Sequence, residues 1–205
     1  MIDPALVRGW LAGRSLSRNL PAPVDDHGGW RVDTDSEDER RRYVFAVPGE
    51  GLIRLAETID EPHVFIKLCA DAETLRRLLP PTWAIRDANH MMVTDNAPVP
   101  TVLPPGYAPT TVSAAGVTHV AIVADDGSVA ASGYAAELDG VFVYDRIVTA
   151  EGHRRRGLGR ALMATLGAVR RDERSQQVLT ATAMGQALYE ALGWRIYAPY
   201  TTASL

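Results

Sequence analysis

The chain has 205 residues, 46% of them hydrophobic, and a formal net charge of −4. This length allows one large or two small domains with a proper core, and the acidic balance argues against a nucleic-acid binder. The one cysteine, Cys69, excludes an intramolecular disulfide, and its apolar neighbours predict a buried core thiol. No apolar run approaches the ~20 residues of a membrane span, and the N-terminus lacks a signal-peptide pattern. We therefore expect a soluble cytoplasmic protein without a membrane partner.

The first hundred residues alternate helical and extended patterns, which is typical of a small α/β unit. Between them, the densely charged stretch 33–42 is expected to be solvated. Residues 25–29 are expected to form a turn. The periodicities predict helices at 3–14, 52–59 and 71–79, strands at 43–47 and 63–69, and short strand pieces at 83–85 and 91–93.

Residues 95–110 differ in composition from both flanks. Five prolines and Gly106 fall close together here, which predicts a linker or a long, stiff crossing loop. We place the domain boundary in this segment, so the expected units are 1–100 and 101–205. The prolines are Pro98, Pro100, Pro104, Pro105 and Pro109.

The second half begins with three apolar stretches separated by turn sequences. Asp125-Asp126-Gly127 and Asp139-Gly140 are hairpin signals, so the three strands are expected to form an antiparallel meander. Gly193 is expected to end the last helix. The predicted order is strands at 117–124, 129–138 and 141–149, a helix at about 158–171, a strand at 177–182, a helix at 184–192 and a strand at 194–200.

The stretch 153–160, His-Arg-Arg-Arg-Gly-Leu-Gly-Arg, lies between the third of these strands and the following helix. Free N–H groups at a helix start, together with arginine side chains, form a good site for phosphate. A Walker loop would need Gly-Lys-Ser/Thr, and a dinucleotide fingerprint would need a small residue where Leu162 stands. The alternative interpretation is a basic helix start that faces solvent.

Two motifs in this half resemble a known family. Arg154-x-x-Gly157-x-Gly159 resembles the pyrophosphate-binding loop of the GNAT N-acyltransferase superfamily, which binds acetyl-coenzyme A. The run from Leu188-Tyr189 to Gly193-Trp194 resembles the family's Leu-Tyr-x-x-x-Gly-aromatic segment. The order of strands and helices matches as well. The resemblance implies the α/β (α+β) GNAT fold, a mixed, mostly antiparallel sheet flanked by helices, with an additional N-terminal α/β unit that could be a degenerate GNAT-like half.

The resemblance also implies an activity and a cofactor. The protein is expected to be an acetyl-coenzyme A-dependent N-acetyltransferase that acts on a primary amine of a small molecule or amino acid by direct attack. Backbone groups at 147–149 would pair with the pantetheine arm, and those at 155–160 would hold the pyrophosphate. Thr182 stands where the family commonly has asparagine. The expected cofactor-binding residues are Ile147, Val148, Thr149, Arg154, Arg155, Arg156, Gly157, Leu158, Gly159, Arg160, Thr182 and Tyr189.

The catalytic roles follow from the same resemblance. Tyr189 occupies the position of the tyrosine that protonates or hydrogen-bonds the leaving sulfur. It lies on the flank of an expected apolar helix stripe that starts at Met184, which allows the hydroxyl to reach a cleft. Many relatives have a glutamate where this chain has Val143, so Asp145, then Glu137, are the candidate bases, and a water relay is a third option.

Several alternatives stay open at this stage. A non-catalytic coenzyme A-binding sensor or interaction module, or an enzyme with a longer acyl donor, would share these motifs. Trp30, Trp83 and the proline-rich segment are candidates to line the acceptor pocket. The expected partner is a small-molecule amine, with no nucleic acid or membrane, and a homodimer is left open. No His, Cys and Asp cluster has metal-ligand spacing.

Overall fold

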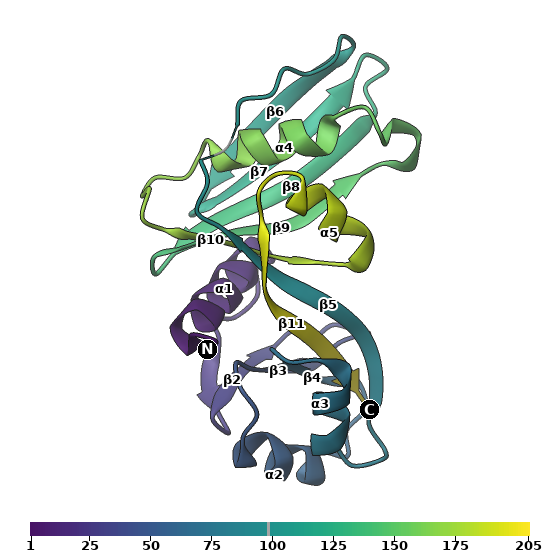
Figure 1. The fold of residues 1–205 in the computed structure, drawn as a ribbon. Helices are drawn as coiled ribbons and strands as arrows, with labels where there is room; N and C mark the ends of the chain where they lie inside the picture. Colours follow the sequence, from purple (N-terminus) through teal and green to yellow (C-terminus); the bar gives the residue numbers. More distant parts are fainter. Residues whose placement is uncertain (98) are drawn as a thin grey trace.

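The computed structural model describes residues 1–97 and 99–205, so Pro98 of the proline-rich segment lies outside the described residues. Within them, one eleven-stranded sheet runs the length of an elongated molecule, and β5 and β11 cross its waist (Figure 1). Helices cover both ends of the sheet. The mixed, mostly antiparallel architecture confirms the predicted fold class.

The N-terminal segment, residues 1–100, forms the helices and strands that its periodicity predicts. Asp3 caps the first helix by accepting a hydrogen bond from Ala5, and Asp71 caps the third in the same way. Residues 84–94 form one long strand instead of two pieces, and residues 24–33 form two strands around the expected turn. The elements are α1 (Pro4–Ser17), β1 (Val24–Asp26), β2 (Gly29–Asp33), β3 (Arg41–Phe45), α2 (Glu50–Thr58), β4 (Val64–Leu68), α3 (Ala72–Leu78) and β5 (Ala84–Thr94).

The C-terminal segment, residues 101–205, contains the predicted meander, extended by an additional edge strand. This strand starts at Tyr107 and includes Pro109, so the expected loop is shorter than its composition indicates. Gly193 has a φ of 81° and follows the last helix as predicted. The elements are β6 (Tyr107–Ala114), β7 (Val117–Ala124), β8 (Val129–Leu138), β9 (Val141–Thr149), η1 (Glu151–His153), α4 (Leu158–Gly167), β10 (Gln176–Ala181), α5 (Ala183–Glu190) and β11 (Arg195–Ser204).

The strand order is β1-β2-β3-β4-β11-β5-β10-β9-β8-β7-β6. Strand β5 lies between β10 and β11, which both come from the C-terminal segment, and β11 lies between β4 and β5, which both come from the N-terminal one. On each side of the β11–β5 pair lies a pair of parallel strands whose two members are connected by a helix. On one side β3 and β4 are connected by α2, and on the other side β9 and β10 are connected by α4. The two segments therefore repeat one arrangement and exchange their last strands. The division at residue 100 stays a prediction.

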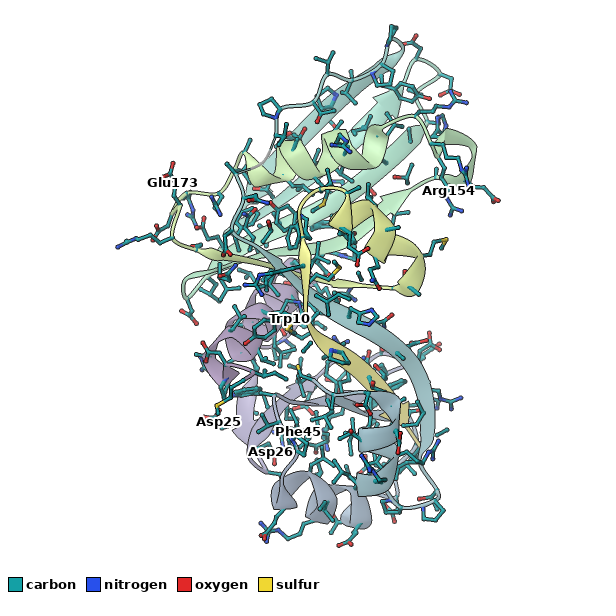
Figure 2. The ribbon with its side chains drawn as sticks, viewed as in Figure 1. Trp10, Asp25, Asp26, Phe45, Arg154 and Glu173 are labelled. Atoms are coloured by element: carbon teal, nitrogen blue, oxygen red, sulfur yellow. The ribbon has the colours of Figure 1, made fainter. Side chains whose placement is uncertain are left out.

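Helix α1 packs closely on β8 and β9, and two glycines allow this. A Cβ atom at Gly9 would lie 2.5 Å from a methyl group of Val141, and one at Gly13 would lie 2.6 Å from a methyl group of Val143. Trp10, at the waist of the molecule (Figure 2), is buried on the same helix. This close approach fixes the distance between the sheet and the C-terminal end of α1, where Arg14 and the cap residue Arg18 lie.

Three expectations about burial were wrong in part, and one was confirmed. Arg42, in the stretch expected to be solvated, is only 5% exposed, because Glu39 pairs with it at 2.7 Å. Met184 is 79% exposed, so the predicted apolar stripe of this helix lacks its first residue, whereas Leu188 and Leu192 pack partly buried against the core. Trp30 and Trp83 belong to core clusters. Cys69 is a buried free thiol, as predicted.

Candidate active site

The central feature of the site is a separation between β9 and β10. These parallel strands pair only from Gln176–Val141 to Val178–Val143, after which they diverge. The diverging residues line a cleft of about 330 Å³, with residues 144–147 on one wall and residues 179–182 on the other. Arg146 has a φ of 52° next to a register shift against β8. Such a left-handed conformation costs roughly 1–3 kcal/mol for a residue other than glycine, and it is typical of functional sites.

The loop between β9 and α4 has the backbone shape of an anion site. Arg155 and Gly157 both have positive φ angles, 62° and 79°, and Gly157 starts α4 without a side-chain cap. Alternation between right- and left-handed residues turns successive N–H groups toward one side, and the uncapped helix start adds further free donors. Gly159 has a different task, because a Cβ there would lie 3.0 Å from Leu188 of α5.

The arginine side chains of this loop are exposed and differ in how they are held. The Nε atom of Arg154 donates to the Thr149 carbonyl at 3.3 Å, and Arg154 projects from the edge of the molecule (Figure 2). Arg156 donates to the Tyr107 hydroxyl at 2.9 Å. Arg160 lines a second, smaller pocket beside α4 rather than the cleft. All four arginine side chains of the loop, Arg155 included, are exposed and therefore accessible to an anion.

The other expected cofactor residues divide into exposed and buried groups. Val148 is 57% exposed, whereas Leu158 is only 1% exposed, so only the backbone of Leu158 can face a ligand. Ile147 lines the cleft. Thr182 also lines it and caps α5, since its hydroxyl accepts a hydrogen bond from the Gly185 N–H at 3.2 Å.

Tyr189 lies on the cleft as the resemblance implies. It is the buried residue of α5, 7% exposed, and its ring packs 6.1 Å from that of Trp194. Tyr189 lines the cleft, and its hydroxyl has no hydrogen-bond partner among the described residues. Burial raises the pKa of Tyr189 to about 12, so the hydroxyl keeps its proton at neutral pH and can act as a hydrogen-bond donor.

Asp145 lines the same cleft but is already engaged. Its carboxylate accepts two hydrogen bonds from Arg18, at 2.7 and 2.8 Å, and one from Ser17 at 2.9 Å. Burial favours the neutral acid, but the hydrogen bonds and positive charge of Arg18, together with Arg14, hold the pKa of Asp145 below its usual range. Asp145 is therefore ionised and fixed in orientation.

Glu137 does not meet the other two candidates. It accepts hydrogen bonds from the backbone N–H groups of Arg171 and Asp172, at 2.8 and 3.0 Å, and from the Ser175 hydroxyl at 2.8 Å. It lines two shallow surface depressions instead of the cleft. In this position Glu137 holds the loop before β10.

Five cleft residues come from the N-terminal segment and were not predicted: Arg14, Arg18, Lys67, Asp87 and Asn89. Arg14 reaches the cleft from α1, Lys67 from β4 and Asp87 from β5. The predicted helix ended at residue 14, so the sequence did not place Arg18 near Arg14; in the structure α1 continues to Ser17 and Arg18 is its C-terminal cap residue. Trp30, Trp83 and the described part of the proline-rich segment do not line this cleft.

Comparisons with known proteins agree with this geometry. Residues 116–196 match the family model of the acetyltransferase (GNAT) domain. Over this span the chain is similar to a GNAT acetyltransferase domain. The assignment confirms the resemblance seen in the C-terminal half, and it implies acyl transfer from an acyl-coenzyme A. No curated protein matches the chain.

Solved structures support the GNAT fold over the whole chain. A GCN5-related N-acetyltransferase from Kribbella flavida is similar with a TM-score of 0.69 and 18% identity, over 100% of this chain and 96% of that one. A GNAT-family protein from Novosphingobium aromaticivorans gives 0.60 and 18%, over 98% and 97%. A tandem GNAT protein from the clavulanic acid biosynthesis pathway gives 0.54 and 15%, over 75% and 66%.

The described residues fit the cofactor that the GNAT domain implies. The uncapped, cationic loop suits a diphosphate, and beyond Val143 the edge of β9 that faces β10 has no pairing strand, which leaves room for an extended chain. No helix among the described residues is long and apolar enough to cross a membrane.

Proposed function

We propose that the protein transfers an acetyl group from acetyl-coenzyme A to the primary amine of a small molecule or amino acid by direct attack. The observation that carries this proposal is the cleft between β9 and β10, which is lined both by Tyr189 and by residues 144–147 of the strand that leads into the 153–160 loop. When bound, acetyl-coenzyme A supplies an acetyl thioester, a reactive carbonyl with a thiolate leaving group.

The loop and β9 hold the cofactor in this proposal. The backbone N–H groups from Arg155 to Arg160, with the side chain of Arg154, bind the pyrophosphate. The backbone of 147–149 binds the pantetheine arm, and Thr182 lines the opposite wall. Binding along β9 directs the thioester toward Tyr189, which holds the reacting groups in a favourable geometry.

Tyr189 stabilises the leaving sulfur. As the carbon–sulfur bond breaks, its hydroxyl donates a proton or a hydrogen bond to the developing thiolate. The raised pKa of about 12 keeps this donor protonated, and the buried position strengthens the interaction because little water competes with it.

The attacking ammonium must lose a proton first, and two carboxylates in the cleft can take it. Asp145 remains a candidate, but its ion pair with Arg18 lowers its pKa and weakens it as a base. Asp87 is exposed and has no ion pair or hydrogen bond within the described part of the chain. We therefore assign Asp87 the role of general base, which accepts the proton of the ammonium, and Asp145 the role of positioning Arg18.

The N-terminal segment, in this proposal, is a degenerate GNAT-like half that supplies the acceptor wall. Strands β3 and β4 pair along all five residues and leave no gap. The loop after β3, Pro48-Gly49-Glu50-Gly51, has an acidic residue in place of arginine, and a Cβ at Gly51 would lie 1.8 Å from the His27 carbonyl. One chain therefore binds one cofactor, which calorimetric titration with coenzyme A measures directly.

A thiol-release assay tests the function. The protein is incubated with acetyl-coenzyme A and a panel of primary amines, and free thiol and acetylated product are measured. We expect release with at least one amine class. Binding of coenzyme A without release on any amine would favour the non-catalytic sensor, and absence of binding would refute both.

A further inference from the structure

The cleft is electropositive although the chain carries a net charge of −4. Four basic side chains and two carboxylates line it, and field lines concentrate in such a cavity, so it attracts anions. The excess of positive charge does not come from the phosphate-binding loop, whose residues 154–160 lie outside this cleft. The charged lining residues are Arg14, Arg18, Lys67, Arg146, Asp87 and Asp145.

Three of the four cations already have protein partners. Arg18 forms its bidentate pair with Asp145. Arg146 donates to the Ser17 carbonyl and stacks 3.6 Å above the ring of Tyr134. The Nζ atom of Lys67 lies 3.3 Å from Glu39. These residues shape the cleft, and their charges are largely compensated.

Arg14 is the exception. It forms no ion pair with a carboxylate within the described residues, and its one hydrogen bond runs from Nη1 to the Thr180 hydroxyl at 3.2 Å. Its Nε atom is buried without an acceptor, and its guanidinium lies 5.4 Å from the Trp10 ring. Burial and the neighbouring Arg18 lower the pKa of Arg14, whereas Asp145, which is already paired with Arg18, raises it only in part toward its usual value. A guanidinium that lines a cleft, has an unpaired Nε and forms no ion pair among the described residues can bind a further anion.

We propose that the acceptor amine carries a carboxylate and that Arg14 binds this carboxylate. The inference rests on the proposed function and narrows its substrate to amino acids and related amino carboxylates. The planar guanidinium forms paired hydrogen bonds with a carboxylate, and Lys67 and its strand neighbour Thr202 line the same cleft. Since Tyr189 lines the cleft from the other segment, an acceptor anchored at Arg14 directs its amine toward the thioester.

Matched acceptors test this proposal. Each amino carboxylate is compared with its carboxamide, its decarboxylated amine and an aminoalkyl phosphate of similar length, in wild type and in Arg14→Gln, by thiol release. We expect kcat/KM for the carboxylate to exceed that for the carboxamide at least tenfold. Loss of a bidentate charged contact should lower the carboxylate value in Arg14→Gln by about 10–100-fold, mainly through KM, and leave the carboxamide value unchanged. Arg14→Lys should give an intermediate loss, because lysine keeps the charge but not the fork.

Two controls separate this site from folding and from the cofactor. Arg8→Gln makes the same change two turns earlier on α1, at an exposed residue beside Asp139, and should alter neither series. The Kd for coenzyme A should be unchanged in Arg14→Gln, which also reports a folded protein. A preference for the carboxamide or the phosphate, or an equal loss for both acceptors in Arg14→Gln, would overturn the proposal.

Direct binding distinguishes the failure of this proposal from the failure of the proposed function. Calorimetric titration of the coenzyme A complex with the amino carboxylates and their carboxamides needs no turnover. If no amine releases thiol but the carboxylates bind and Arg14→Gln abolishes that binding, the carboxylate site stands and the transferase proposal falls. If the carboxylates and carboxamides bind equally, the carboxylate site falls even where thiol is released.

Discussion

Replacing Tyr189 by phenylalanine removes one hydroxyl that has no partner among the described residues of the protein. The ring packs against Trp194, with centroids 6.1 Å apart, and phenylalanine keeps this contact. No internal hydrogen bond is lost, so the free energy of unfolding should change by no more than ~0.5 kcal/mol. The substitution therefore tests chemistry with little effect on folding.

The expected magnitude follows from the burial of Tyr189. A hydrogen bond to a charged group contributes about 1.5–3 kcal/mol, and the hydroxyl lies in a site that is 7% exposed. The leaving thiolate is charged in the transition state, whereas the thioester sulfur of the bound cofactor is not. The substitution should thus lower kcat by about 10–150-fold, at 1.36 kcal/mol for each factor of ten.

Steady-state thiol release measures kcat, and calorimetry measures the Kd for acetyl-coenzyme A. The Kd for acetyl-coenzyme A should stay within about twofold, since the interaction forms mainly as the bond breaks. Tyr197→Phe is the matched control: it makes the same change on β11, at a hydroxyl that meets the Asp3 N–H and does not line the cleft. A kcat for Tyr189→Phe equal to that of Tyr197→Phe would remove Tyr189 from the mechanism.

Three further substitutions test the remaining parts of the site. Reversing the charge of Arg154 and Arg155 to glutamate should raise the Kd for coenzyme A about 100-fold or more, measured by calorimetry, while the same change at exposed Arg174 should have no effect. Asp87→Asn should lower kcat about 100-fold, as expected for loss of a general base, and Asp139→Asn should not; equal rates would return the proton to Asp145 or to water. Asp145→Asn leaves Arg18 without its counter-ion and should cost about 2–4 kcal/mol in urea unfolding at pH 7. Because the folded pKa of Asp145 is lowered, this difference should be fully present above the unfolded pKa of ~3.9 and disappear as the pH falls through the folded value; a difference that persists at pH 2 would contradict the ion-pair explanation.

Local pattern was sufficient for the C-terminal half of the site. Residues close in sequence predict the meander, the loop at 153–160 and α5, so the positions of Gly157 and Tyr189 in these elements could be predicted. The burial within the charged stretch 33–42 could not be predicted, because Arg42 is buried through its ion pair with Glu39, which also lies 3.3 Å from Lys67 of β4. Whether a buried charge has a partner depends on which strands pair, and hydrophobic periodicity within one segment does not predict strand pairing.

The acceptor wall could not be predicted for a related reason. Arg14 was on an expected helix, but only the packing of Gly9 and Gly13 against β9 brings it to the cleft. Asp87 falls between two expected strand pieces, and its position follows from the pairing of β5 with β10 and β11. The positions of Arg14 and Asp87 therefore depend on contacts between parts of the chain that are distant in sequence.

The exchange of β5 and β11 has a consequence for how the protein forms. Until residues 195–204 have been synthesised, β4 has an open edge in the middle of the future sheet, and an open edge of this kind invites pairing with other chains. Pairs so distant in sequence also form slowly. A chain cut between residues 94 and 107 would yield two fragments that each lack a strand held by the other, so they should regain activity only as a reassembled complex.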